Sequence, residues 1–254
     1  MMDFSSFIPY HLLPWQWAAW ICMGLFIGLS KTGFIGITAF IIPVIALIFG
    51  AKESTGIILP LLCFADLLAV WYYHSQAEWK YIIKLLPWTL AGFGTALFAD
   101  RLVPVQEFKY LMGGCILAGI AVMIWNDTRS KSKPPPSTWW FSALFGIAGG
   151  FATMIGNVAG PIMTVFLLSM RLPKNSFVGT SAWFFLIVNY MKLPIQILVW
   201  NNITVQNLIF GLTVVPAIIA GAILGILLIK KISEPLYRKT MIALTLVSAV
   251  LLFI

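Results

Sequence analysis

The segment 28-GLSKTGFIG-36 places glycine, hydroxyl and charged side chains inside a long apolar run. A second segment, 154-MIGNVAGP-161, interrupts the apolar sequence of the second half of the chain in a similar way. At membrane depth, irregular backbone is tolerated only where it is buried in protein or lines a water-filled cavity. Paired interruptions in corresponding positions of two halves are the best sequence indication of a transport site. We therefore expect these two segments to form the functional centre.

The composition indicates an integral membrane protein. The chain has 254 residues, of which 61% are hydrophobic and 9% charged, and its mean hydropathy is +0.97. Soluble domains carry about 25% charged residues. The apolar runs are helix-length, unlike the ~10-residue alternating strands of outer-membrane barrels. The net charge of +8 comes from lysine and arginine scattered between apolar runs, which indicates membrane topology rather than nucleic-acid binding.

The chain divides into two halves joined by a charged, proline-rich linker over 127–137. We predict an all-α protein in which each half is a broken helical hairpin followed by three transmembrane helices. Repeat 1, residues 1–126, would contain the hairpin at about 15–50 and spans at about 54–73, 85–99 and 106–125. Repeat 2, residues 138–254, would contain the hairpin at about 138–170 and spans at about 175–200, 205–229 and 235–254. The total stays open between about eight and ten helices, because each broken segment could be re-entrant or cross twice.

Matched spacing supports an internal repeat. Pro87 and Gly92 correspond to Pro216 and Gly221 at one constant offset. Basic residues favour the cytoplasmic side, which would place the linker inside together with three basic loops. These loops contain Lys80 and Lys84, Arg171 and Lys174, and Lys230 and Lys231. Both termini would then lie outside, and the two repeats would have inverted topology.

Lys31 is the most unusual residue of the first interruption. A charged side chain in mid-membrane costs at least ~3 kcal/mol on insertion scales. If the next half-helix begins near Gly33, its amide groups would form an anion site together with Ser30, Lys31, Thr32 and Gly33. Alternatively, Lys31 lies near the membrane surface and extends its ammonium group to water.

The second interruption supplies a matching set of candidates. Gly156, Asn157 and Gly160 would face the first break, with Asn157 acting as a helix cap, an anion ligand or both. Thr180 and Ser181, which follow Gly179, either line the same cavity or serve as packing groups between helices.

Three further polar residues lie inside predicted spans and are candidates for coupling or ion pairing. Asp66 would pair with Lys31 or Lys192, or titrate as a coupling group. Asn189 lies in the same span as Lys192. The Lys192 side chain either lies in the cavity or reaches the membrane surface.

At these residues the chain resembles the sulfite exporter TauE/SafE family of membrane permeases. The resemblance rests on Gly28 to Phe34 and Pro43 in the first half, and on Gly156 to Pro161, Gly179-Thr180, Asn189 and Lys192 in the second. It covers nearly the whole chain and implies transport of small sulfur-containing anions, such as sulfite or organosulfonates, across a bacterial inner membrane.

We therefore predict a secondary transporter for a small sulfur-containing anion, working by alternating access. The expected partners are the anion and the lipid bilayer, with no cofactor, metal or nucleic acid, and the sequence is compatible with a homodimer. One alternative is an anion channel of the same fold. A second is a sulfur-transfer protein that uses Cys22, Cys63 or Cys115, and a third is a membrane scaffold without transport.

Overall fold

The computed structural model describes residues 10, 12–40, 42–99 and 138–251, and every helix within them is α or 3-10, with no strand. The predicted span at 106–125, the linker at 127–137 and Cys115 fall outside these residues. The first half contains α1 (Pro14–Thr32), η2 (Ile37–Phe40), α2 (Ile42–Phe49), α3 (Ala51–Tyr73), η3 (His74–Gln76) and α4 (Trp79–Ala99). The second contains α6 (Trp139–Gly156), α7 (Gly160–Ser169), α8 (Lys174–Leu198), α9 (Val205–Gly211), η4 (Leu212–Val214), α10 (Val215–Lys231) and α11 (Glu234–Leu251).

Five helical segments among the described residues are long and apolar enough to cross a membrane. They are Glu53–Gln76, Trp79–Ala99, Trp139–Gly156, Lys174–Leu198 and Val205–Lys231. The helix α4 begins at Trp79, earlier than predicted, because its first turns carry the exposed side chains of Lys80 and Lys84 beyond the apolar run.

Both predicted breaks are present, but the first differs from the prediction. The helix α1 continues through Ser30 and ends at Thr32, and the next α-helix begins only at Ile42, so the expected helix start near Gly33 is wrong. The last carbonyls of a helix lack intrahelical partners, and two tyrosine hydroxyls supply them here. Tyr73 donates to the Thr32 carbonyl and Tyr237 to the Gly33 carbonyl, each at 3.1 Å.

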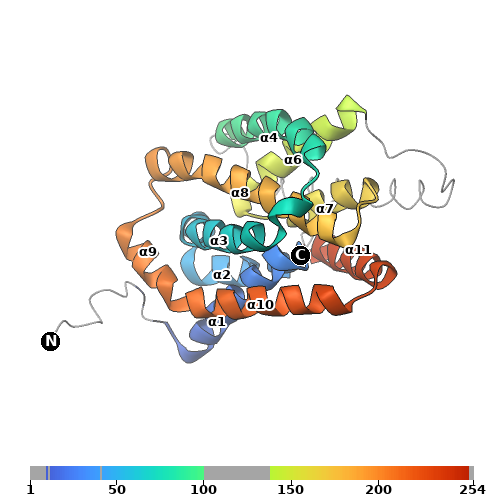
Figure 1. The fold of residues 1–254 in the computed structure, drawn as a ribbon. Coiled ribbons are helices and arrows are strands. Elements are labelled where there is room, and N and C mark those ends of the chain that lie inside the picture. The colour runs from blue at the N-terminus through green and yellow to red at the C-terminus, as the bar shows by residue number, and fades with distance from the viewer. Residues whose placement is uncertain (1–9, 11, 41, 100–137, 252–254) are drawn as a thin grey trace.

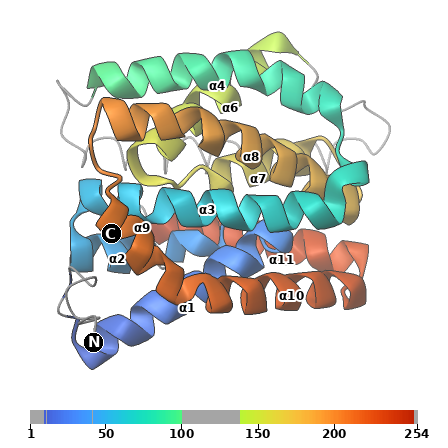
Figure 2. The same cartoon turned by 60° about the vertical axis from the view of Figure 1, so that its left-hand side comes forward.

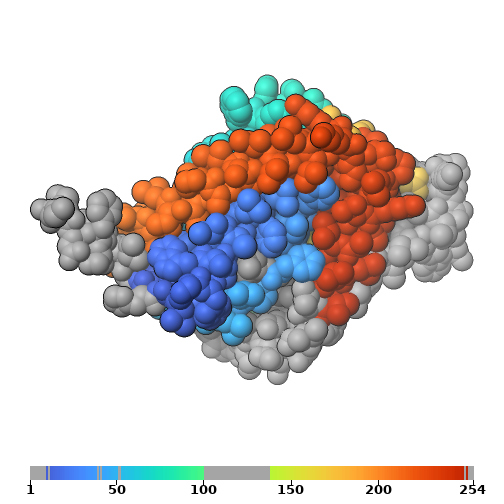
Figure 3. Space-filling model, turned by 90° about the horizontal axis from the view of Figure 1, so that it is seen from below, coloured from blue at the N-terminus to red at the C-terminus, as the bar shows by residue number. Residues whose placement is uncertain are grey.

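Six of the helices form three pairs, one central and two flanking. The helices α3 and α8 lie side by side in the middle, α4 runs along α6 on one side, and α1 runs along α10 on the other (Figures 1 and 2). Seen from below, α10 borders α1 along the surface (Figure 3). In Figure 2, α3 runs from left to right and α8 from right to left. The two central helices are therefore antiparallel, and the inverted relation between the halves stays a prediction.

Close helix contacts repeat between the halves. A Cβ on Gly28 of α1 would lie 2.0 Å from the Ile218 carbonyl of α10, and one on Gly150 of α6 would lie 2.2 Å from the Thr89 carbonyl of α4. Gly150 follows Gly28 by 122 residues, and Ile218 follows Thr89 by 129 residues. The contact between α1 and α10 therefore corresponds, residue by residue, to the contact between α6 and α4. The same two offsets relate the contacts of Gly92 to those of Gly221. These matched approaches support the internal repeat.

The exposed surface is apolar where lipid would lie. On α10, Ile219, Ile223 and Leu227 recur every four residues and are 40–53% exposed. Basic side chains instead gather at the end of the molecule that holds the α3–α4, α7–α8 and α10–α11 turns, on the right of Figure 2. This grouping agrees with the predicted cytoplasmic loops, although which side of the membrane this end faces remains a prediction.

Candidate functional site

The two helix breaks touch each other. A Cβ added to Gly160, at the start of α7, would come within 2.9 Å of the Gly36 Cα atom. Gly36 itself has φ +95°, a conformation that side-chain-bearing residues rarely adopt. Glycine at both positions therefore permits the contact, and the two interruptions form one centre, as the sequence predicted.

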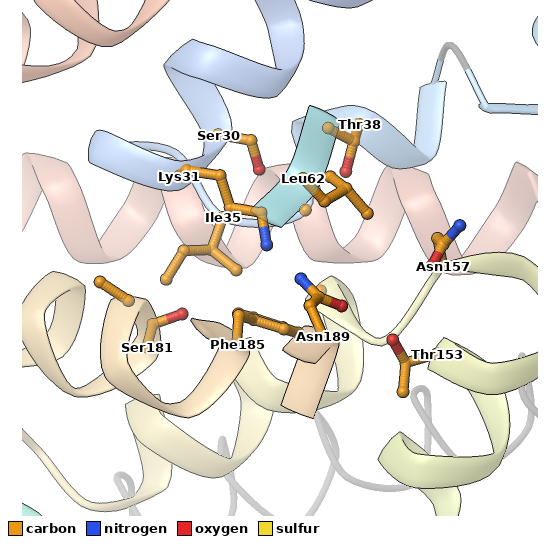
Figure 4. A pocket seen from close by; sticks show the side chains of 13 residues that line it. Ser30, Lys31, Ile35, Thr38, Leu62, Thr153, Asn157, Ser181, Phe185 and Asn189 are labelled. Atoms are coloured by element: carbon orange, nitrogen blue, oxygen red, sulfur yellow. The ribbon is translucent and has the colours of Figure 1, made fainter. Parts of the chain in front are cut away.

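A central cavity of about 20 Å³ lies beside this contact, and a volume of this size holds roughly one water molecule. Its walls come from α1, the first break, η2, α3, α6, the second break, α7 and α8. The lining residues are Ser30, Lys31, Ile35, Gly36, Thr38, Leu62, Thr153, Asn157, Gly160, Ser181, Ala182, Phe185 and Asn189. Figure 4 shows that their polar groups converge on this space from both halves of the chain.

Six of the sequence candidates line the central cavity: Ser30, Lys31, Asn157, Gly160, Ser181 and Asn189. The other six do not: Thr32, Gly33, Gly156, Thr180, Asp66 and Lys192. The Thr32 hydroxyl donates to the Ala222 carbonyl of α10 at 2.8 Å, and Thr180 accepts from the Glu78 amide at 2.9 Å. Both hydroxyls thus join neighbouring elements, and Ser181, one residue further around α8, faces the cavity instead.

Several lining residues were not predicted. Thr153 lies one helical turn before Asn157, and side chains four positions apart share a helix face, so this spacing could have indicated it. Thr38 and Phe185 carry no comparable signal in the sequence. Their positions depend on how η2 and α8 turn toward the cavity.

Lys31 extends its ammonium group into the cavity wall from the last turn of α1. The Nζ atom lies 2.8 Å from Asp66 Oδ1 and 4.3 Å from the centroid of the Phe185 ring. Figure 4 shows it directed toward Asn189 and Phe185 of α8. The side chain is 9% exposed, so it does not extend to the surface. Of the two pairings considered for Asp66, the one with Lys31 is present.

The Asp66 carboxylate is fully buried and both its oxygens are engaged. Oδ1 pairs with Lys31, and Oδ2 accepts a 2.6 Å hydrogen bond from Asn189 Nδ2. The amide oxygen of Asn189, Oδ1, is buried and has no hydrogen-bond partner among the described residues. Because Asn189 lines the cavity, this acceptor calls for a donor there, such as water or a protonated ligand.

Lys192 lies behind the cavity wall, neither in the cavity nor at the surface. It is fully buried, and its Nζ atom donates to three oxygens: the Thr153 carbonyl at 3.0 Å, Thr153 Oγ1 at 2.8 Å and Asn157 Oδ1 at 2.6 Å. Asn157 has a left-handed φ of 56° and donates its Nδ2 to the Thr55 carbonyl at 3.2 Å. Lys192 thus holds two cavity-lining side chains in place.

The half-helix dipoles around the cavity differ from the prediction. The α1 end at the first break is a C-terminus, which presents carbonyl groups and favours the cation of Lys31. At the second break, α7 begins at Gly160, so its N-terminus faces the cavity and favours negative charge there. One half-helix N-terminus, rather than two opposed ones, therefore borders the central cavity.

Neither described cysteine takes part in this centre. Cys22 is exposed and Cys63 is buried, and neither lines the cavity. Within the described ranges, no group of three or more His, Cys, Asp or Glu side chains could hold a metal ion.

Comparison with known proteins places the chain in a family. No curated protein and no solved structure matches it. The model of one family, described as "Sulfite exporter TauE/SafE", matches residues 18–252, which is nearly the whole chain. The chain therefore belongs to the sulfite exporter TauE/SafE family of membrane transport proteins.

Proposed function

We propose that this protein is a secondary transporter that moves a small sulfur-containing anion, of the sulfite or organosulfonate class, across the inner membrane. The anion binds in the central cavity against the Lys31 ammonium group, the adjacent hydroxyls and the N-terminus of α7. The observation that carries the proposal is the position of Lys31: a nearly buried cation lines the cavity where two broken helices meet. Such ionisable groups inside membrane proteins mark substrate pathways.

Alternating access would come from rocking one half against the other about the α3–α8 pair. A cavity of about 20 Å³ does not admit a sulfur oxyanion without movement of the walls, so binding requires a conformational change. On the predicted orientation, the end with the α3–α4, α7–α8 and α10–α11 turns faces the cytoplasm and both termini lie outside.

Counterflow in proteoliposomes tests the carrier mechanism. Vesicles loaded with unlabelled sulfite are diluted into radiolabelled sulfite, with the membrane potential held at zero. A carrier accumulates the label transiently above equilibrium, whereas a channel equilibrates without an overshoot. Absence of both overshoot and protein-dependent flux would refute transport of sulfite.

Substitution of Lys31 tests the site. Lys31→Met should lower sulfite affinity by roughly 10- to 100-fold, because hydrogen bonds to charged groups contribute about 1.5–3 kcal/mol. The single variant also leaves the Asp66 carboxylate buried without its cation, which costs about 3–5 kcal/mol in stability. The double variant Lys31→Met/Asp66→Asn removes both charges and isolates the effect on transport.

The double variant should fold nearly as stably as the wild type and still fail to transport sulfite. Lys84→Met serves as a matched control, because Lys84 is exposed and does not line the cavity. Wild-type flux in the double variant would remove Lys31 from the mechanism. Equal loss of flux in Lys84→Met would mean that the assay reports total charge rather than the cavity.

A further inference from the structure

The two ends of the central α3–α8 pair are closed by matched contacts. The basic end holds the α3–α4, α7–α8 and α10–α11 turns, and there a Cβ on Gly179 of α8 would lie 2.9 Å from the Gln76 Cβ atom. At the opposite end, which holds the α8–α9 connection, a Cβ on Gly56 of α3 would lie 2.1 Å from the Asn202 carbonyl. Gly179 follows Gly56 by 123 residues. Each central helix therefore packs, near its start, against the segment that follows the other helix (Figure 2).

A hydroxyl group beside each glycine adds a hydrogen bond to the same closure. At the basic end Thr180 Oγ1 accepts from the Glu78 amide at 2.9 Å, and at the α8–α9 end Thr55 Oγ1 accepts from Asn202 Nδ2 at 3.2 Å. The part of α8 that lines the central cavity begins at Ser181, directly after the first closure, and ends before the second. Each closure thus lies between the cavity and one end of the molecule.

The two closures differ in the side chain that faces the neighbouring broken helix. Tyr73, at the end of α3, donates its hydroxyl to the carbonyl of Thr32, the last residue of α1, at 3.1 Å. Gln196 follows Tyr73 by 123 residues and holds the corresponding position near the end of α8. Its side chain is fully buried, yet neither Nε2 nor Oε1 has a hydrogen-bond partner among the described residues. Such an amide calls for a partner that this arrangement of the helices does not supply.

The contacts of Lys192 show which groups lie near Gln196. Lys192 lies one helical turn before Gln196 on the same face of α8, and its Nζ atom donates to the Thr153 carbonyl and to Asn157 Oδ1 at the end of α6. The helix α6 is the broken helix of the second half, as α1 is of the first. Because the last carbonyls of a helix lack intrahelical partners, the end of α6 offers Gln196 the kind of acceptor that Tyr73 binds at the end of α1.

We propose that Tyr73 and Gln196 are alternate gate residues of the transport cycle. In this structure the Tyr73 hydroxyl holds the basic end closed. In the opposite state Tyr73 releases the Thr32 carbonyl, the basic end opens, and the Gln196 amide donates to the carbonyl end of α6 and holds the α8–α9 end closed. This inference rests on the proposed function and names the side chains that stabilise each state.

The accessibility of one cavity residue tests the two gates. Ser181→Cys places a thiol in the cavity wall of a chain whose three native cysteines are replaced by alanine. A membrane-impermeant methanethiosulfonate reagent is added to one side of oriented vesicles, and Lys231→Cys, exposed at the basic end, identifies the side that this end faces. The labelling rate of the Ser181→Cys thiol from that side then reports how often the basic end opens.

Tyr73→Phe and Gln196→Met nearly conserve volume and should change this rate in opposite directions. Tyr73→Phe removes the hydrogen bond that holds the closed state, so labelling should accelerate about three- to tenfold, the equivalent of one hydrogen bond. Gln196→Met removes the group that holds the open state, so labelling should slow by a similar factor. Tyr72→Phe and Gln206→Met are the matched controls, because both side chains are exposed and do not line the cavity, and they should leave the rate unchanged.

An unchanged rate in Gln196→Met would mean that a bound water alone satisfies Gln196, and it would overturn the inference. Shifts of the same sign in Tyr73→Phe and Gln196→Met would also overturn it, and so would equal shifts in the controls. Failure of Gln196→Met to fold counts against it too, because the lost amide would then have a partner in the closed state. Sulfite flux in wild-type proteoliposomes separates the two proposals: absence of flux together with the expected labelling shifts would refute the proposed function and leave the gate residues standing.

Discussion

Two glycines on the same helix should respond in opposite directions to the same substitution. Gly92 and Gly94 both lie in the interior of α4, but Gly92 faces α6 and Gly94 faces outward. A Cβ at Gly92 would come within 2.4 Å of the Ile147 carbonyl and 2.8 Å of the Phe151 amide, whereas one at Gly94 would meet nothing within 4 Å. Since these neighbours are backbone atoms, α4 and α6 must move apart to admit the methyl group.

The magnitudes follow from two effects. Alanine in place of glycine stabilises a helix interior by about 0.5–1 kcal/mol, and Gly94→Ala should show this gain. Gly92→Ala obtains the same gain but loses about 1–3 kcal/mol from overpacking, so it should be destabilised by up to about 2.5 kcal/mol. Because the helix gain is common to both variants, their free energies of unfolding should differ by the overpacking loss, about 1–3 kcal/mol.

Reversible unfolding in mixed micelles, titrated with sodium dodecyl sulfate and followed by circular dichroism, measures both variants against the wild type. Equal stabilities for Gly92→Ala and Gly94→Ala would refute the close approach of α4 and α6. Stabilisation by both substitutions would mean that the helices separate at no cost.

Three further predictions concern helix ends and can be measured by the same unfolding assay. Asn157→Gly and Asn157→Ala lose the same hydrogen bonds, but alanine should be about 1–2 kcal/mol less stable because φ is 56° at this position; equal stability would contradict the left-handed turn. Lys174→Met should cost about 1–3 kcal/mol because its Nζ donates to two main-chain oxygens at the end of α10, whereas the exposed Lys231→Met should cost less than ~0.5 kcal/mol. Tyr237→Phe should cost about 1 kcal/mol through loss of the hydrogen bond to the Gly33 carbonyl, and an unchanged stability would show that this bond does not stabilise the end of α1.

The positions of the breaks could be predicted because they depend on local sequence. Glycine and polar residues inside an apolar run identified the two interrupted segments from the sequence alone, whereas the contact between Gly36 and Gly160 became visible only in the structure. The residue at which the next α-helix begins, Ile42, could not be predicted in this way. The hydroxyl groups of Tyr73 and Tyr237, which come from α3 and α11, satisfy the carbonyl end of α1, and no local pattern in the sequence places them there.

The candidate site was predicted in part for a similar reason. Lys31 and Asp66 are conspicuous in sequence, and two opposite charges inside a membrane are expected to pair. The choice between Thr180 and Ser181 depends on the rotation of α8 about its axis, which one residue changes by about 100° at 3.6 residues per turn. The residues around Thr180 and Ser181 are mostly apolar, so the sequence shows no polar face that would fix the rotation of α8.

Asp66 faces an amide, and not a second carboxylate, across the central pair of helices. Asp66 and Asn189 are 123 residues apart, close to the offset of 122 residues between α1 and α6. The two residues hydrogen-bond each other within the central α3–α8 pair. A symmetric pair of carboxylates at 2.6 Å would repel, and one would have to take a proton. An amide in the second half removes this conflict and leaves a single carboxylate. That carboxylate pairs with Lys31 at 2.8 Å, so the pair is neutral in the interior of the molecule.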